Sequence, residues 1–269
     1  MMPPFRVRTL GQGPRVLLVH GSVTNSVTWS SLRGLGRSYT LVLPDRPGYP
    51  PNPPLARIDF ETQADELAEL LGESAHVVGF SYGGVISLLL AGRNPERVRS
   101  LTVIEPPCFG VAEHVPAIRE LSRDMQALWA EGEDDPAVFL PRFAASFGAE
   151  GQVPPTVQPG REQGVRALMV ERGPWEAEIP LEALAGADFP TLVCSAGSHP
   201  AYEAVCDVLA ERTGGERVVL RGAGHAVHLA SGFRERLERF LAAAEDARAR
   251  RSAGPAPAPL PRGGGRAGS

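Results

Sequence analysis

The chain has 269 residues, of which 43% are hydrophobic and 22% charged, a composition typical of a globular protein with one large domain and an insertion, or with two small domains. Its formal net charge of −4 gives no electrostatic reason to expect nucleic acid or an acidic membrane surface as a partner. Every basic residue is arginine, and the absence of lysine excludes catalysis through a lysine Schiff base.

No apolar run approaches the roughly 20 residues that a membrane-spanning helix needs, and the N-terminus lacks the apolar core of a signal peptide. The sequence therefore predicts a cytoplasmic protein that does not bind membranes. Its three cysteines, Cys108, Cys194 and Cys206, are an odd number without the spacing of a zinc site. Neither a disulfide framework nor a structural metal is expected from them.

Short apolar runs recur along the chain, and most are continuous stretches of Val, Leu and Ile instead of alternating ones. Continuous runs are expected of parallel strands that are buried on both faces of a sheet. The expected strands are residues 15–20, 39–43, 76–80, 101–104, 192–195 and 217–220.

Helical patterns separate several of these strands. Residues 62–71 carry apolar side chains at helical spacing, and Thr62 with Asp65 resembles a capping box at the start of that helix. Similar patterns at residues 85–91 and 202–211 each follow a strand. Strands that alternate with helices predict an α/β fold with a mostly parallel, doubly wound sheet.

Between Ile104 and Leu192 the strands stop, and helix-like stretches occur at residues 117–129, 136–147 and 163–170. A helical insertion between two strands of one sheet is typical of a lid over an active site, with simple packing as the alternative. Six aromatic residues there are candidates for an apolar pocket wall or for ordinary core: Phe109, Trp129, Phe139, Phe143, Phe147 and Trp175.

We therefore divide the chain into a core of residues 1–106 and 186–247, a helical lid of residues 107–185, and a tail of residues 248–269. The tail consists largely of Ala, Pro, Gly and Arg. Because it has almost no large apolar residues, burial cannot offset the entropy lost on ordering it. The tail is predicted to be disordered.

The most informative motif is Gly-Phe-Ser-Tyr-Gly at residues 79–83, between an expected strand and an expected helix. A serine at a sharp strand-to-helix turn projects its Oγ away from a crowded backbone, which tolerates only small neighbours such as Gly79 and Gly83. The N–H groups at the start of the following helix favour a negative oxygen nearby. The motif predicts that Ser81 is a nucleophile.

A serine hydroxyl is a weak nucleophile at neutral pH, so it needs a histidine base and a carboxylate that fixes the tautomer of that base. The chain has six histidines. His225 ends a Gly-Ala-Gly-His segment after the last expected strand, where small neighbours allow an imidazole to reach across the carboxyl edge of the sheet. His199 is a weaker candidate for the base, and a pocket residue is the alternative for it.

Four motifs in this order resemble the α/β-hydrolase family. They are His20-Gly21 after the first long strand, Asp-Arg-Pro-Gly-Tyr at residues 45–49, the turn around Ser81, and the terminal Gly-x-Gly-His that ends at His225. The resemblance covers residues 5–243. It implies a mostly parallel α/β-hydrolase sheet with a helical lid inserted between strands, and the chemistry of a serine hydrolase.

The resemblance also implies which backbone N–H groups form the oxyanion hole. They are those of Tyr82, the residue after the nucleophile, and of Ser22, with Val23 as the alternative to Ser22. Each donor aimed at a developing oxyanion lowers the barrier by about 3 kcal/mol. His20 and the charged residues of the 45–49 motif are interpreted as organisers of loops.

The acid is where this sequence departs from the common family pattern. Many relatives place an aspartate after the strand that corresponds here to residues 191–195, but this chain has no carboxylate there until Glu203. Some relatives place the acid one strand earlier, where this chain has Glu105. A carboxylate at the end of a buried strand is costly to bury without a partner. Glu105 is therefore favoured over Glu203 and Asp207.

The expected reaction is acyl transfer, in which Ser81 attacks a small or medium ester, lactone or thioester, His225 acts as base and Glu105 orients it. The same scaffold could instead serve cyclisation, elimination or carbon–carbon cleavage of a biosynthetic intermediate. A ligand-binding homologue without turnover is the third possibility, motivated by the missing carboxylate after Gly197. No cofactor or metal is expected, the expected partner is a small-molecule substrate, and the sequence gives no basis for an oligomeric state.

Overall fold

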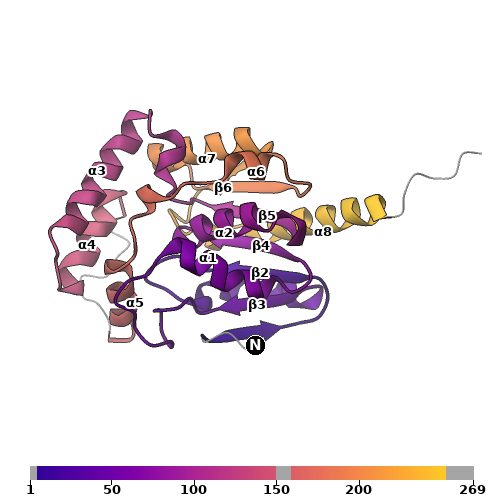
Figure 1. The fold of residues 1–269 in the computed structure, drawn as a ribbon, viewed down its shortest axis with the longest axis horizontal. Helices are drawn as coiled ribbons and strands as arrows, with labels where there is room; N and C mark the ends of the chain where they lie inside the picture. The colour runs from indigo at the N-terminus through magenta and orange to yellow at the C-terminus, as the bar shows by residue number, and fades with distance from the viewer. Residues whose placement is uncertain (1–4, 150–158, 253–269) are drawn as a thin grey trace, which may run out of the picture.

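The computed structural model describes residues 5–149 and 159–252, arranged around a seven-stranded sheet in the order β1-β3-β2-β4-β5-β6-β7 (Figure 1). The strands are β1 (Val7–Leu10), β2 (Arg15–Val19), β3 (Thr40–Pro44), β4 (Ala75–Phe80), β5 (Val98–Ile104), β6 (Thr191–Ser195) and β7 (Glu216–Val219). Only β1 pairs antiparallel, with β3, while the other pairings are parallel. The predicted α/β fold with a mostly parallel sheet is confirmed.

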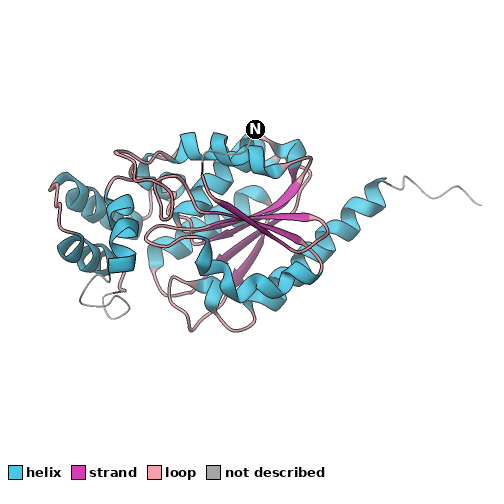
Figure 2. Cartoon of the chain, turned by 90° about the horizontal axis from the view of Figure 1, so that it is seen from below, coloured by secondary structure: helices cyan, strands magenta, loops and turns pink. Residues whose placement is uncertain are grey.

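Helices cover both faces of this sheet (Figure 2). One face is covered by α1 (Phe60–Ala68), α2 (Tyr82–Arg93), α6 (Leu181–Ala185) and α7 (Pro200–Thr213). The other face is covered by the 3-10 helix η1 (Ser26–Arg37) and by α8 (Phe233–Ser252). Shorter 3-10 helices lie in the connections: η2 (Glu69–Leu71), η3 (Pro95–Arg97), η4 (Phe109–Ala112), η6 (Pro174–Glu176) and η7 (Val227–Leu229).

Two apolar layers explain why the strands read as continuous runs. All six residues of β4 are buried. Two adjacent residues of this strand, Val77 and Val78, pack in different apolar layers. Because successive side chains of a strand point to opposite faces, both faces need apolar residues when helices cover both. Full burial of a valine contributes about 1.5–3 kcal/mol relative to leaving it exposed.

The insertion between β5 and β6 carries three helices that lie beyond one end of the sheet, on the left in Figure 1. They are α3 (Pro116–Ala130), α4 (Pro136–Ser146) and α5 (Pro159–Met169). Each of these helices contributes one residue to a small apolar cluster of Leu128, Phe139 and Leu168. The fourth helix of this stretch, α6, packs against α2 and α7 of the core.

The end of the chain differs from the expectation. Helix α8 continues to Ser252, so residues 248–252, expected to begin a disordered tail, are helical. Alanine and arginine have high helix propensity, and extending an existing helix costs far less than starting one. The rest of the expected tail, residues 253–269, lies outside the described residues. No helix in the described ranges is long and apolar enough to span a membrane.

The start of α1 also differs from the expectation. The N-cap is Asp59, whose carboxylate accepts hydrogen bonds from the N–H groups of Glu61 and Thr62 at 2.9 and 3.2 Å. The capping box expected at Thr62 and Asp65 is therefore wrong. Aspartate accepts hydrogen bonds well at the N-cap position and is also favoured by the helix dipole. The helix therefore begins at Phe60, two residues earlier than the apolar periodicity suggested.

Candidate active site

Ser81 lies on the turn between β4 and α2, in a backbone conformation that residues with a side chain rarely adopt. Its φ is 53° and its ψ is −126°. Its N–H donates to the carbonyl of Ile104 at 2.9 Å, which fixes the turn to the next strand. A Cβ on Gly79 would lie 2.3 Å from Ser87 Oγ, and one on Gly83 would lie 2.3 Å from the carbonyl oxygen of His20. These contacts support the steric argument made for small neighbours.

His225 and Glu105 meet Ser81 at the carboxyl edge of the sheet. His225 Nε2 lies 2.9 Å from Ser81 Oγ, and His225 Nδ1 lies 2.6 Å from Glu105 Oε2. Because a carboxylate only accepts hydrogen bonds, Nδ1 carries the proton and donates to Glu105, and Nε2 is left to accept from the Ser81 hydroxyl. The structure thus brings together the three residues expected to form the triad.

Glu105 directly follows β5 and is fully buried. Its Oε1 accepts a hydrogen bond of 2.7 Å from the N–H of Ala196, the first residue after β6. Its φ of 42° lies in the left-handed region, so its backbone is strained as well. Both carboxylate oxygens have a partner, which meets the cost of burying the charge.

The alternative candidates make other contacts. Glu203 accepts from the N–H of Gly197 at 2.9 Å and from Arg217 at 2.6 Å. Asp207 accepts from the same Arg217 side chain at 2.8 Å. His199 caps α7, and its Nδ1 accepts from the N–H of Ala201 at 3.2 Å.

His199 nevertheless lies near the site, because it lines a small cavity of about 80 Å³ together with Glu105 and His225. Burial lowers the pKa of His199, so its ring is neutral at physiological pH. The structure therefore places it as a cavity residue that also caps a helix.

Aromatic rings hold the imidazole of His225. Its ring centroid lies 4.8 Å from that of Tyr202, 5.1 Å from that of Phe80 and 5.5 Å from that of Phe147. The side chain is only 17% exposed. This packing restricts the orientation of the ring.

The backbone N–H groups of Ser22, Val23 and Tyr82, near Ser81, have no acceptor within the described ranges. Tyr82 is the first residue of α2, where the N–H has no intrahelical partner. Ser22 and Val23 line the cavity beside Ser81, and the φ of Val23 is 67°. These are the N–H groups that were expected from the sequence to form the oxyanion hole. Ser22 and Val23, the two alternatives for the second donor, both line the cavity.

The cavity beside Ser81 has a volume of about 200 Å³ and mostly apolar walls. The core supplies Phe80 and the two loop residues, and the insertion supplies one face of α4 and Arg161 of α5. The α4 residues are Leu140, Phe143, Ala144 and Phe147, the last directly after the helix. Of the six aromatic residues named for a pocket wall, two lie here.

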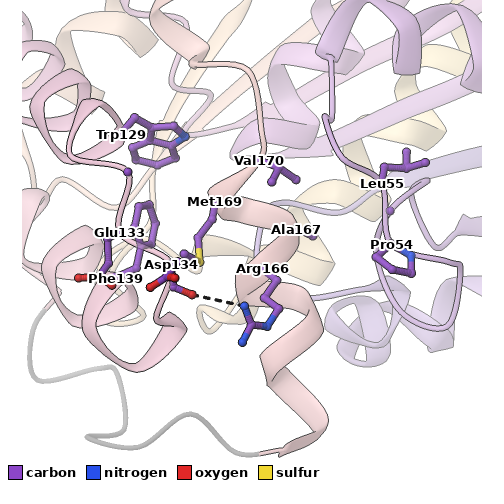
Figure 3. Close-up of a pocket in the computed structure, with 12 residues that line it drawn as sticks. Pro54, Leu55, Trp129, Glu133, Asp134, Phe139, Arg166, Ala167, Met169 and Val170 are labelled. Carbon is purple, nitrogen blue, oxygen red and sulfur yellow. Dashed lines mark hydrogen bonds between the residues drawn. The ribbon is translucent and has the colours of Figure 1, made fainter.

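A larger cavity of about 420 Å³ lies apart from Ser81, between the insertion and the loop that carries Pro54 and Leu55 (Figure 3). Trp129 and Phe139 line it, and Arg166 donates to the carbonyl of Asp134, another lining residue, at 3.3 Å. The remaining two aromatic candidates, Phe109 and Trp175, line a third hollow. The larger of these two cavities is therefore not the one that contains the nucleophile.

A buried polar cluster lies behind the Ser22 loop. The N–H of Arg46 donates to His20 Nε2 at 2.9 Å, and the Arg46 guanidinium donates to Glu171 Oε1 at 2.7 Å. Burial and the neighbouring Arg46 hold the pKa of His20 well below its usual value, so His20 is neutral. His20 and Arg46 thus connect loops, as interpreted from the sequence.

Glu171 is a residue that the sequence reasoning missed. Its side chain is buried and also accepts hydrogen bonds from Tyr49 Oη and Ser22 Oγ. The one signal in the sequence is a carboxylate placed directly after an apolar helical run. Within the described ranges no three His, Cys, Asp or Glu side chains are grouped as metal ligands.

Curated proteins similar to this chain include ester hydrolases by name. Pimeloyl-(acyl-carrier protein) methyl ester esterase of Aeromonas hydrophila is 35% identical over 116 residues, which cover 42% of this chain and 46% of that protein. The protein of the same name from Chromobacterium violaceum is 38% identical over 99 residues, 36% of this chain and 39% of that protein. The chain thus spans less than half the length of these relatives.

Solved structures match over most of the chain. An alpha/beta hydrolase from Sphaerobacter thermophilus has a TM-score of 0.66 and 25% identity, covering 88% of this chain and 95% of its own. A thermophilic esterase from Thermogutta terrifontis has a TM-score of 0.65 and 20% identity, covering 91% and 93%, and shares the fold. A family model described as the alpha/beta hydrolase family matches residues 16–259. The chain therefore belongs to the alpha/beta hydrolase family.

Proposed function

We propose that the protein is a serine hydrolase that cleaves a small or medium ester, lactone or thioester through an acyl-enzyme intermediate. The observation that carries this proposal is the hydrogen-bonded series from Ser81 through His225 to Glu105. The names of the curated relatives, which are methyl ester esterases, support a carboxylic ester as substrate.

In the acylation step, Ser81 Oγ attacks the carbonyl carbon of the substrate and its proton passes to His225 Nε2. Glu105 accepts from Nδ1 and stabilises the imidazolium that forms. When the tetrahedral intermediate collapses, the bond to the leaving group breaks and the leaving oxygen or sulfur takes the proton from Nε2. Water then repeats the sequence on the acyl-enzyme and releases the acid.

The negative oxygen of each tetrahedral intermediate would accept from the N–H of Tyr82 and from the N–H of Ser22 or Val23. These donors are fixed before the substrate arrives, so they cost no reorganisation during the reaction. Loss of one such donor typically lowers kcat by about 10²–10³-fold. The positive end of α2 adds to this stabilisation.

The contact of Glu105 with His225 supports a complete triad despite the missing carboxylate after Gly197. That gap was the feature that favoured a binding protein without turnover. The strained backbone of Ser81 and Glu105 also supports catalysis, because strain of this kind gathers at functional sites.

We further propose that α3, α4 and α5 form a lid that sets substrate specificity. Phe143 and Phe147 of the α4 region form part of the wall beside Ser81, and the cavity holds about 200 Å³. Apolar walls of this size favour short or medium acyl chains over long ones. Substitution of Phe143 by Ala should therefore shift the preference toward longer acyl chains.

The test is reaction of the protein with a fluorophosphonate probe, followed by intact-protein mass, alongside hydrolysis of p-nitrophenyl acetate and butyrate. Wild type should gain one probe mass and hydrolyse the esters, and Ser81→Ala should do neither while remaining folded. No labelling and no turnover by folded wild type would contradict the proposal and favour the ligand-binding alternative. Labelling with slow turnover of both esters would point to a different use of the same triad.

A further inference from the structure

Glu171 belongs to the insertion, and its backbone is fastened on two sides. The neighbouring N–H of Arg172 donates to the carbonyl of Ile58 at 2.7 Å, and the N–H of Ile58 donates to the carbonyl of Val170 at 2.9 Å. On the other side, Trp129 Nε1 of α3 donates to the carbonyl of Glu171 at 3.2 Å. The residue is therefore held at the junction of the insertion and the core.

The carboxylate of Glu171 has a partner on each oxygen. Oε1 accepts from Arg46 and from Tyr49, both at 2.7 Å, and Oε2 accepts from Ser22 Oγ at 2.5 Å. The side chain is 1% exposed, so these bonds are not exchanged for bonds to water. Of these three partners, only Ser22 lies on the loop that lines the cavity beside Ser81.

The loop of residues 21–23, which we call the oxyanion loop, needs external support. Val23 is a β-branched residue with a φ of 67°, a conformation that such residues avoid. Helix α5 packs closely against it, since a Cβ on Gly164 would lie 2.2 Å from the carbonyl oxygen of Val23. The conformation of the loop therefore depends on groups that the insertion supplies.

We propose that Glu171 is a positioning residue that, through the hydroxyl of Ser22, holds the oxyanion loop with its N–H groups directed at the reacting carbonyl. This inference rests on the proposed hydrolase function. It makes the insertion a part of the catalytic apparatus and not only a cover, because separation of the segment around Glu171 from Ile58 would withdraw the carboxylate and release the loop.

Ser22→Ala is the sharpest test, because it removes the hydroxyl and leaves the contacts of Glu171 with Arg46 and Tyr49 in place. With p-nitrophenyl butyrate, kcat should fall about tenfold while KM stays within twofold, since the oxyanion forms only after binding. Affinity for a boronic acid that forms a tetrahedral adduct should fall by a similar factor. Ser22→Thr keeps a hydroxyl and should recover most of the loss.

A matched control separates positioning from stability. Ser74 is also a buried serine, and its hydroxyl accepts from Arg99 at the opposite edge of the sheet. Ser74→Ala should leave kcat within twofold of wild type. The melting temperatures of the Ser22→Ala and Ser22→Thr variants should agree within about 2 °C, so that lost folding does not explain the lost rate.

Glu171→Gln completes a double-mutant cycle. Its kcat should fall at least as far as that of Ser22→Ala, and the double variant should be no slower than Glu171→Gln alone, because both changes break the same link. If Glu171→Gln does not fold, the pair Ser22→Ala and Ser22→Thr still decides the matter.

Three results would overturn the inference. If wild type hydrolyses esters and Ser22→Ala keeps its kcat within twofold, or Ser22→Thr restores nothing, Glu171 does not position the loop and the proposed function stands. If wild type neither hydrolyses esters nor reacts with a fluorophosphonate, the proposed function fails and this inference fails with it.

Discussion

The two edges of the parallel sheet are built from different backbone conformations. At the carboxyl edge, three residues other than glycine have a positive φ, Val23, Ser81 and Glu105, and within the described ranges these are the only ones. At the amino edge, His76 and Ser100 lie in β4 and β5 beside a register shift between Ala75 and His76, neither has a positive φ, and their side chains bond to each other at 2.8 Å. Strained residues cost roughly 1–3 kcal/mol each, so the molecule concentrates this cost where chemistry is proposed.

The amino edge contributes stability without strain. Arg99 donates to both carboxylate oxygens of Glu245 in α8, at 2.9 and 2.7 Å. This contact joins the start of β5 to the last helix and is partly buried, which favours a charge-assisted pair over exchange with water. The carboxyl edge therefore carries the strained backbone of the candidate site, whereas the amino edge carries contacts that hold α8 to the sheet. Variants can test this division.

The largest effect should come from the acid at the carboxyl edge. Glu105→Gln should lower kcat by roughly 10³–10⁴-fold with little change in KM, because an amide no longer fixes the tautomer of His225 or stabilises its imidazolium. The measurement is steady-state hydrolysis of p-nitrophenyl butyrate. Glu203→Gln is the matched control and should stay within about threefold of wild type. Activity above a tenth of wild type in Glu105→Gln would move the acid elsewhere.

The next effect concerns the close approach of α2 to β2 below Ser81. Gly83→Ala should lower the free energy of unfolding by about 3 kcal/mol or more, since its Cβ would lie 2.3 and 2.4 Å from two backbone oxygens of β2 and the residue after it. Gly160 in α5 has no atom of the described residues within 4 Å of an added Cβ. Gly160→Ala should raise stability by up to about 1 kcal/mol. Urea unfolding of both variants measures the contrast, and equal stabilities would refute it.

The same backbone constraints show why much of the fold was readable from the sequence. Each expected strand overlaps an observed one, because burial on both faces leaves a continuous apolar run. β1 was missed because it is short, lies at the edge, and is half exposed, so its residues carry no such run. The N-cap of α1 was misplaced because Asp59 precedes the apolar periodicity instead of beginning it.

The site was readable only in part. Ser81 directly follows β4 and Glu105 directly follows β5, and because these strands are parallel neighbours, their ends bring the two residues together. The catalytic roles of both residues stay a prediction. Glu171 was not readable, because it comes from the insertion, more than a hundred residues from its partners Ser22, Arg46 and Tyr49. The backbone bonds of Ile58 with residues 170 and 172 place these groups side by side, and no local pattern encodes that long-range pairing.

His76 at the amino edge should affect how the free energy of unfolding changes as the pH falls. Burial lowers the pKa of His76 to about 4, an effect that the contact with Glu245 opposes and Arg99 reinforces. Because the folded pKa lies below the unfolded value of about 6.5, this neutral histidine stabilises the fold fully above pH 6.5, and the stabilisation is lost as the pH falls toward 4. The expected loss is up to about 3 kcal/mol.

His76→Gln removes this titration. Its free energy of unfolding should change less than that of wild type between pH 7 and pH 4, by up to about 3 kcal/mol, while kcat at pH 7.5 stays within twofold. Urea unfolding at several pH values gives the difference, and the carboxylates that titrate in both proteins cancel in the comparison. Identical pH profiles for the two proteins would show that His76 is not held neutral by burial.

The smallest effect is the most direct measure of the strain itself. At Ser81, where φ is 53°, glycine relieves the crowding that any Cβ suffers, so Ser81→Gly should be more stable than Ser81→Ala by about 1 kcal/mol. At Ser100, in β5 at the amino edge, φ is not positive, so the order should reverse, with Ser100→Gly less stable than Ser100→Ala by about 0.5–1 kcal/mol. Each pair loses the same hydroxyl, so the difference within a pair reports the backbone conformation together with the packing of one Cβ. The same sign at both positions would mean that the turn at Ser81 stores no strain, and the contrast between the two edges would then rest on side-chain contacts only.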